Sequence, residues 1–263
     1  MQSDETNEIK KNNEEQYLYD KEVTCPVCGV KLKVPVVKTT AYRVKGKDSD
    51  FYINYSLINP YFYDVWLCNE CGYTAMKSDF EKIRKRDIDI VLKEIALKWK
   101  RRYYPMVHDI NIAIELFKLS LLTNSIIEAK SSRKAMNCLK LAWMYRILED
   151  NDNEQIFLKQ SLHEFSEAYF KEDFPIYGMD KFATMYLIGE LHRRTGNDQE
   201  ALMQFSNVIT NSNAGRKIKD LAITQKDLIK NNPIVEPDLA DENEDESDTQ
   251  IKKKHGLFSK FFK

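Results

Sequence analysis

The spacing of apolar residues changes once along this chain, close to residue 78. Before that point, apolar and polar residues alternate in short segments rich in valine and aromatic residues, a pattern typical of β-strands. After it, apolar residues recur about every 3.6 positions, which is the period of an amphipathic helix. Only 7 prolines and 8 glycines interrupt 263 residues, which favours helices. We therefore predict an α+β protein that is predominantly α.

The predicted elements follow from these two periods. The β segments are Lys31 to Val37, Thr39 to Val44, Asp50 to Leu57 and Phe62 to Leu67. Turns are expected at Lys45 to Ser49 and at Asn59-Pro60, since a residue before proline is driven away from the helical conformation. A first helix, capped by Ser78 or Asp79, extends its apolar stripe to Leu97. Further helices are predicted at about 107–127, 131–149, 154–171, 179–195, 198–210 and 213–231.

Four of the five cysteines form two motifs of the same spacing, Cys25-Pro26-Val27-Cys28-Gly29 and Cys68-Asn69-Glu70-Cys71-Gly72. Two residues between cysteines let both thiolates face one ion, and the glycine that follows can adopt the positive φ of a tight turn. We therefore predict one structural zinc ion, with the ligands Cys25, Cys28, Cys68 and Cys71. The insert at 29–67 exceeds the usual separation of about 15 to 20 residues, so it must fold as a β excursion that brings the motifs together. The fifth cysteine, Cys138, lies among helix formers and is expected to be a small buried side chain.

Two alternatives to a structural zinc ion are less well supported. A disulfide framework suits an extracellular protein, but the first twenty residues are charged and polar and do not resemble a secretory signal, so we expect a cytoplasmic protein. Catalytic zinc keeps one position open for water and usually has a histidine or carboxylate ligand. Here four cysteines complete the ligand set, and neither motif adjoins His108, His163, His192 or His255. The sequence also contains no phosphate-binding glycine loop or nucleophile elbow, and we predict that the protein is not an enzyme.

One part of the helical region resembles a tetratricopeptide repeat. Gly189, Gly196, Ala201 and Phe205 lie at offsets of 0, 7, 12 and 16 residues, and Gly189 would let two paired helices approach closely. The array is irregular, because the similar Ala142 lies 47 residues before Gly189 where a repeat of about 34 is required. A single helical pair cannot bury its apolar face alone. We therefore expect neighbouring pairs to form one tetratricopeptide-like domain of helical hairpins.

Composition divides the chain into five parts. We predict a disordered lead-in at 1–20, a zinc-ribbon module at 21–77, the helical domain at 78–231, an acidic linker at 232–250 and a basic-aromatic tail at 251–263. In the tail, Leu257, Phe258, Phe261 and Phe262 would share one face of a helix. This segment could touch an anionic membrane surface, fold back onto a groove of the helical domain, or have no binding role.

The motifs together resemble a known family. The segments that carry the resemblance are Cys25 to Gly29, Asn59-Pro60, Cys68 to Tyr73 and Tyr186 to Leu191. They are similar to an uncharacterised bacterial family, the domain of unknown function numbered 2225, over about 21–230. The resemblance implies an N-terminal zinc ribbon before a tetratricopeptide-like helical region, in a bacterial cytoplasmic protein. It implies no activity.

Two functions remain for such a protein. The seven aromatic residues from Phe51 to Trp66 and a basic helix face from Lys82 to Arg102 could bind nucleic acid. Packing explains them better, because a small metal domain needs large side chains for its core and acidic residues interrupt the basic face. A net charge of −1 gives no general attraction to nucleic acid either. We expect a protein-interaction adaptor or scaffold whose helices bind a protein or peptide, with a nucleic-acid-binding regulator as the alternative.

Overall fold

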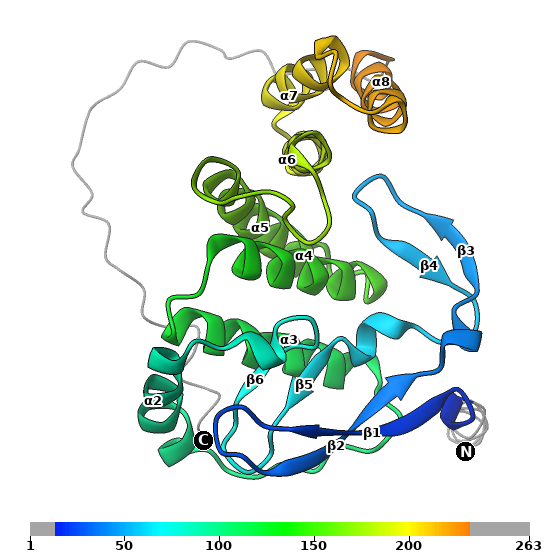
Figure 1. Cartoon of the computed structure of the whole chain (residues 1–263). Coiled ribbons are helices and arrows are strands. Elements are labelled where there is room, and N and C mark those ends of the chain that lie inside the picture. The colour runs from blue at the N-terminus through cyan, green and yellow to red at the C-terminus, as the bar shows by residue number, and fades with distance from the viewer. Residues whose placement is uncertain (1–13, 232–263) are drawn as a thin grey trace, which may run out of the picture.

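The computed structural model describes residues 14–231, in which three short antiparallel hairpins precede and meet a stack of helices (Figure 1). The strands are β1 (Leu18–Thr24), β2 (Lys31–Val37), β3 (Val44–Lys47), β4 (Ile53–Tyr55), β5 (Val65–Leu67) and β6 (Thr74–Met76). The helices are α2 (Lys85–Glu94), α3 (Ile110–Ile126), α4 (Ser131–Ile147), α5 (Asn151–Lys171), α6 (Lys181–Arg194), α7 (Asp198–Thr210) and α8 (Arg216–Asn231). The predicted α+β class, predominantly α, is confirmed. In the part described, no helix is long and apolar enough to cross a membrane.

Each cysteine motif forms the turn of one hairpin. The first motif connects β1 to β2 and the second connects β5 to β6. The third hairpin, β3–β4, comes from the insert between the motifs. It extends from the ribbon to the helical stack, where Figure 1 shows it beside α4 and α6.

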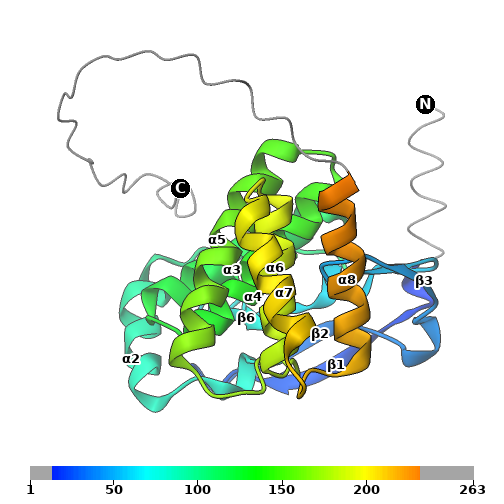
Figure 2. The ribbon, with the colours of Figure 1, turned by 90° about the horizontal axis from the view of Figure 1, so that it is seen from above.

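From α3 to α8, each helix packs on the next one in the chain, and Figure 1 shows the resulting stack from the side. In Figure 2 the stack is seen from above, with α7 and α8 in front. Aspartates fix three of the helix starts, because Asp109, Asp150 and Asp180 accept hydrogen bonds from backbone N–H groups of the first turn at 2.9, 3.1 and 2.7 Å. The close approach predicted at Gly189 is confirmed: a Cβ atom there would lie 2.8 Å from the Phe205 ring. A larger residue would therefore force α6 and α7 apart.

The ribbon and the helices share their cores. One cluster of buried side chains joins Tyr52, Val65 and Met76 of the hairpin region to helices α3 to α6. A second cluster combines three of the motif cysteines with Ile127 and Ala129, which follow α3. Burial of apolar surface, at about 25 cal/mol per Å², therefore stabilises the two regions jointly rather than separately.

The aromatic side chains of the insert pack against the helices. The Tyr52 and Tyr61 rings lie 5.4 and 5.1 Å from the Trp143 ring of α4, centroid to centroid. Phe51 lies 5.4 Å from Tyr186 of α6. These separations suit favourable aromatic pairs. The predicted packing role of this segment is confirmed, and its partners include side chains of α4 and α6.

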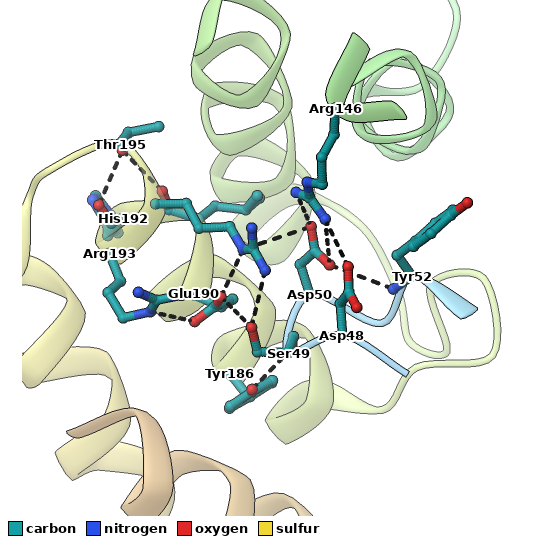
Figure 3. Close-up of polar contacts among 12 residues, drawn as sticks. Asp48, Ser49, Asp50, Tyr52, Arg146, Tyr186, Glu190, His192, Arg193 and Thr195 are labelled. Atoms are coloured by element: carbon teal, nitrogen blue, oxygen red, sulfur yellow. Dashed lines mark hydrogen bonds and ion pairs between the residues drawn. The ribbon is translucent and has the colours of Figure 1, made fainter. Parts of the chain in front are cut away.

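Buried charges also hold the β3–β4 hairpin on the helices (Figure 3). Asp50, at the tip, is fully buried and accepts hydrogen bonds from Arg146 at 2.6 Å and from the Trp143 indole at 3.0 Å. Burial alone would raise the pKa of Asp50, but the hydrogen bond and charge of Arg146, with the charge of Arg194, outweigh burial and lower it. The charged form of Asp50 is therefore the stable one in the folded protein.

A second buried carboxylate completes this contact. Glu190 of α6 is fully buried and accepts hydrogen bonds from Ser49 at 2.6 Å, from Arg194 at 2.7 Å and from Arg193 at 2.7 Å. Tyr186 also donates to the Ser49 carbonyl at 2.9 Å. We call the contacts of Asp50 and Glu190 with these arginines the hairpin lock. Sequence proximity explains the contacts of Glu190 with Arg193 and Arg194, but not those of Asp50 and Ser49 with residues about 100 or more positions away.

Several predicted β boundaries are wrong. Thr39–Ala41 is a 3-10 turn instead of a strand, because its turn buries Ala41 under Ile58 and Tyr63. The turn predicted at Lys45 to Ser49 lies further along, since β3 continues to Lys47 and Phe51 donates to the Asp48 carbonyl at 3.1 Å. The hairpin lock accounts for this shift, because it holds the acidic residues at the tip.

The single helix predicted from Ser78 is also wrong. The segment divides into a 3-10 turn at Phe80–Lys82, the helix α2 and a 3-10 turn at Ala96–Lys98. Asp79 precedes the first turn but makes no capping hydrogen bond with its side chain. These two interruptions of the helix direct Phe80 and Ile95 towards the core around the cysteines. Packing against the ribbon thus overrides the helical period.

The N-terminal strand starts earlier than the predicted start of the zinc-ribbon module. β1 begins at Leu18, so the predicted disorder of the lead-in is wrong for the last residues before Lys21. Leu18 is buried beside Val37, and this burial explains why the strand starts early. Residues 1–13 lie outside the described residues, as do the predicted linker and the tail with Leu257, Phe258, Phe261 and Phe262.

We predict that Asp50→Asn lowers the free energy of unfolding by about 3 kcal/mol, because it removes the fully buried one of the three carboxylates that pair with Arg146, the others being Asp48 and Glu154. The melting temperature should fall by about 10 °C, measured by circular dichroism. The control Asp227→Asn removes an exposed charge on α8 and should change stability by less than about 0.5 kcal/mol.

The difference in stability between wild type and Asp50→Asn should be complete at pH 7 and should shrink as the pH falls below about 4. The reason is that the lowered pKa makes Asp50 stabilising only while it is ionised. Equal melting temperatures for the two variants would contradict the hairpin lock.

Candidate metal centre

The two cysteine motifs have nearly identical backbone geometry. Gly29 and Gly72 have φ angles of +75° and +74°, the left-handed conformation that glycine adopts without a Cβ clash. Their N–H groups donate to the carbonyls of Cys25 and Cys68 at 2.9 and 2.7 Å. Each turn thus directs two sulfur atoms to the same side. The glycine conformation predicted from the sequence is confirmed at both positions.

The four sulfur atoms meet between the two hairpins. The Sγ atoms of Cys25, Cys28, Cys68 and Cys71 all lie within 4.8 Å of one another. Across the hairpins, Cys25 and Cys71 are separated by 3.7 Å, and Cys28 and Cys68 by 3.5 Å. A zinc–sulfur bond of about 2.3 Å gives a tetrahedron with edges of about 3.8 Å, whereas a disulfide needs about 2.05 Å. The cluster therefore has the dimensions of a four-thiolate metal site, and the predicted convergence of the motifs is observed.

The chemistry of the cluster also fits a cation. Hydrogen bonding with Cys68 raises the pKa of Cys25 to about 12, and hydrogen bonding with Cys25 likewise raises the pKa of Cys71. Hydrogen bonds from Cys25 and Cys71 lower the pKa of Cys68 to about 2, because its thiolate accepts them. Four thiolates at this spacing would repel one another strongly in a partly buried site. A bound cation removes that repulsion, and four cysteines supply the soft ligands that zinc and related metals prefer.

This arrangement is accompanied by a family match. The chain matches, over residues 18–229, the family described as "Uncharacterized protein conserved in bacteria (DUF2225)". The chain belongs to this family. No curated protein and no solved structure matches it. The resemblance expected from the motifs is thus confirmed, and membership in DUF2225 supplies no activity for the metal centre.

In this DUF2225 member, the second motif is covered while the first is open at one ligand. The Trp99 indole donates to the Asn69 carbonyl at 3.0 Å, and a Cβ atom at Gly72 would lie 2.6 Å from the Trp99 ring. The Asn69 side chain also bonds the Arg102 backbone, accepting from its N–H at 2.9 Å. Cys28 is exposed, whereas the other three ligands are buried. Any residue other than glycine at position 72 would displace the Trp99 cover.

The other polar residues considered from the sequence lie elsewhere. Among the described residues, no histidine belongs to the sulfur cluster. His108 is buried, its Nδ1 lies 3.0 Å from the Phe62 carbonyl, and its ring stacks on Tyr63. Cys138 is buried in the helical core as predicted, and burial raises its pKa to about 12. His192, on α6, has a buried Nδ1 atom with no hydrogen-bond partner, and burial lowers its pKa.

An apolar groove of about 400 Å³ is the second candidate site. Helix α4 forms one wall of the groove, and α6 with the loop before it forms another. Helix α8 contributes Ile218, and the β3–β4 hairpin contributes Phe51 and Ile53. The remaining lining residues are Lys47, Met136, Leu139, Trp143, Tyr177, Gly178, Met179, Ala183 and Leu187. The sequence suggested a groove among the helices, but it did not predict that the β3–β4 hairpin forms part of the lining. The structure shows that Phe51 and Ile53 of the hairpin line the groove.

We predict that the protein as purified contains one metal ion per chain, measured by inductively coupled plasma mass spectrometry. Cys68→Ser should lose the ion and lower the melting temperature, because it removes one of four ligands from a fully buried position. Cys138→Ala is the control, since it removes a thiol outside the cluster and should keep the full metal content. Equal metal content in the two variants would contradict the site.

Proposed function

We propose that this protein is a cytoplasmic, zinc-stabilised adaptor that binds an apolar segment of a partner protein in the groove beside the β3–β4 hairpin. The observation that carries this proposal is the groove itself, because four separate elements converge to line it. Its volume of about 400 Å³ is in the range of ligand-binding clefts. The hairpin lock fixes the outer wall against α4 and α6.

The lining favours a peptide over a polar small molecule. Trp143 and Phe51 offer broad apolar faces, while Met136 and Met179 have flexible side chains that adapt to varied partners. An amphipathic helix or short apolar segment binds such a surface through a few anchoring side chains. Lys47 stands at the edge, with its Nζ 4.4 Å from the centre of the Phe51 ring. It can therefore contact an acidic group flanking the bound segment.

In this proposal the metal is a zinc ion with a structural role. Four cysteine ligands with tetrahedral spacing suit zinc and leave no position for a catalytic water. Structural zinc contributes about 10–16 kcal/mol of binding free energy in small zinc-finger peptides. Here it would hold together the two hairpins from which the insert emerges. Catalysis has no part in the proposed function.

Nucleic-acid binding has less support. Base stacking needs an exposed ring, but Tyr52 and Trp66 are only 6% and 7% exposed. Some basic side chains of this face form ion pairs within the protein. Examples are Arg84 with Asp87 and Arg101 with Glu70. Such pairing reduces the positive field that would attract phosphate groups.

The groove can be tested with two matched variants of α8. Ile218→Lys introduces a charge into the groove, whereas Ile223→Lys adds the same charge to the same helix at a site that is 43% exposed and outside the groove. Full-length baits would be incubated with bacterial lysate, and partners retained by wild type would be identified, purified and titrated by calorimetry. We predict that Ile218→Lys weakens binding at least about tenfold and that Ile223→Lys does not. Equal affinities for the two variants would contradict the proposal.

A further inference from the structure

We propose that the groove has an occupant within the same chain: the segment Leu257 to Phe262 docks in it and must be displaced by a partner protein. The inference uses the same groove as the proposed function and names its resident ligand. It rests on three properties that can be read from the sequence and the described residues. These are the apolar pattern of the segment, the length of chain available, and the charges along its path.

The apolar pattern of the segment fits the lining of the groove. Leu257, Phe258, Phe261 and Phe262 would lie on one side of a helical turn, while Ser259 and Lys260 would face away. The groove presents apolar side chains from both of its walls. A helix bound there can bury adjacent anchors against α4 and α6, and its polar side remains in solvent. This is the binding mode expected for a short amphipathic segment.

The chain is long enough to reach. The described helix α8 ends at Asn231, and its first turn contains Ile218, which lines the groove. These two positions are about 20 Å apart along the helix axis, at 1.5 Å per residue. Residues 232–256 connect Asn231 to the segment, and a flexible chain of that length has a root-mean-square span of about 28 Å. The tether therefore matches the distance back along α8.

Charge favours the same path. The connection contains an acidic stretch from Glu236 to Asp248. The beginning of α8 carries Arg216, Lys217 and Lys219 around Ile218, and the Arg216 side chain is 95% exposed. The acidic stretch can pass these cations as it returns along α8. The basic run from Lys252 to Lys254 then stands between it and the apolar segment, so Lys47 at the edge of the groove favours a partner with an acidic flank over the tail. Complementary charges of this kind increase the rate and specificity of docking.

Docking within one chain is favoured over docking between two copies. A short flexible tether of matched length gives an effective concentration in the millimolar range. A second copy reaches that value only at millimolar protein concentration. A partner protein would then compete with the segment, and its apparent affinity would be reduced by the fraction of grooves that the segment occupies. The tail would thereby set a threshold for partner binding.

Photocrosslinking in the full chain tests this inference. The photoreactive amino acid p-benzoyl-phenylalanine would replace Phe258, on the apolar side, or Ser259, on the polar side as the matched control. After irradiation, crosslinked peptides would be identified by mass spectrometry. We predict crosslinks from position 258 to groove residues such as Met136 or Met179 within one chain, with a yield at least about tenfold higher than from position 259. The variant Ile218→Lys should abolish this difference, while Ile223→Lys should preserve it.

Three other results would overturn the inference. Crosslinks between chains, seen as a covalent dimer, would assign the segment to a second copy. Crosslinks to lipid in vesicles with 30% phosphatidylserine, together with loss of the groove crosslinks, would assign it to a membrane surface. Equal yields from positions 258 and 259 would show that the apolar side is not docked. If partner binding still depends on Ile218 in any of these cases, the proposed function survives without the tail.

Discussion

The meeting of four cysteine sulfur atoms from two separate hairpins is the constraint on which the rest of the structure depends. Cys28 and Cys68 lie 40 positions apart, yet their sulfur atoms are 3.5 Å apart. The chain between them must leave the cluster and return, and it uses this excursion to form the β3–β4 hairpin. The sulfur cluster therefore fixes both ends of the insert that forms the hairpin. The hairpin, in turn, supplies one wall of the apolar groove.

Buried charge makes this arrangement specific. Asp50 and Glu190 are both fully buried, and burial of a carboxylate is costly unless its partners are well placed. Asp50 meets the arginines of α4 and α6, and Glu190 meets Ser49, only when the hairpin tip has its observed position. Shared apolar clusters add the favourable energy that these charges do not supply. We therefore interpret the ribbon and the helices as one cooperative unit, which differs from the two modules that composition suggests.

The sequence predicts features that depend on local spacing and misses those that depend on distant contacts. The cysteine pairs and the close approach at Gly189 were predictable because each requires only a few neighbouring residues. The predicted helix after Ser78 failed because Phe80 packs into the ribbon core, which the local period does not reveal. The cover that Trp99 forms over Gly72 was likewise beyond reach, since it joins residues from different elements. The zinc ion, the adaptor role and the absence of catalysis remain predictions.

Hydrogen–deuterium exchange with and without metal tests the central claim most directly. The measurement compares exchange at residues 48–52, the tip of the β3–β4 hairpin, before and after the metal is removed with a chelator. If the metal centre positions the hairpin on the helices, exchange at the tip should accelerate together with exchange in the two motif turns. Faster exchange confined to the motif turns, with the tip unchanged, would contradict the account.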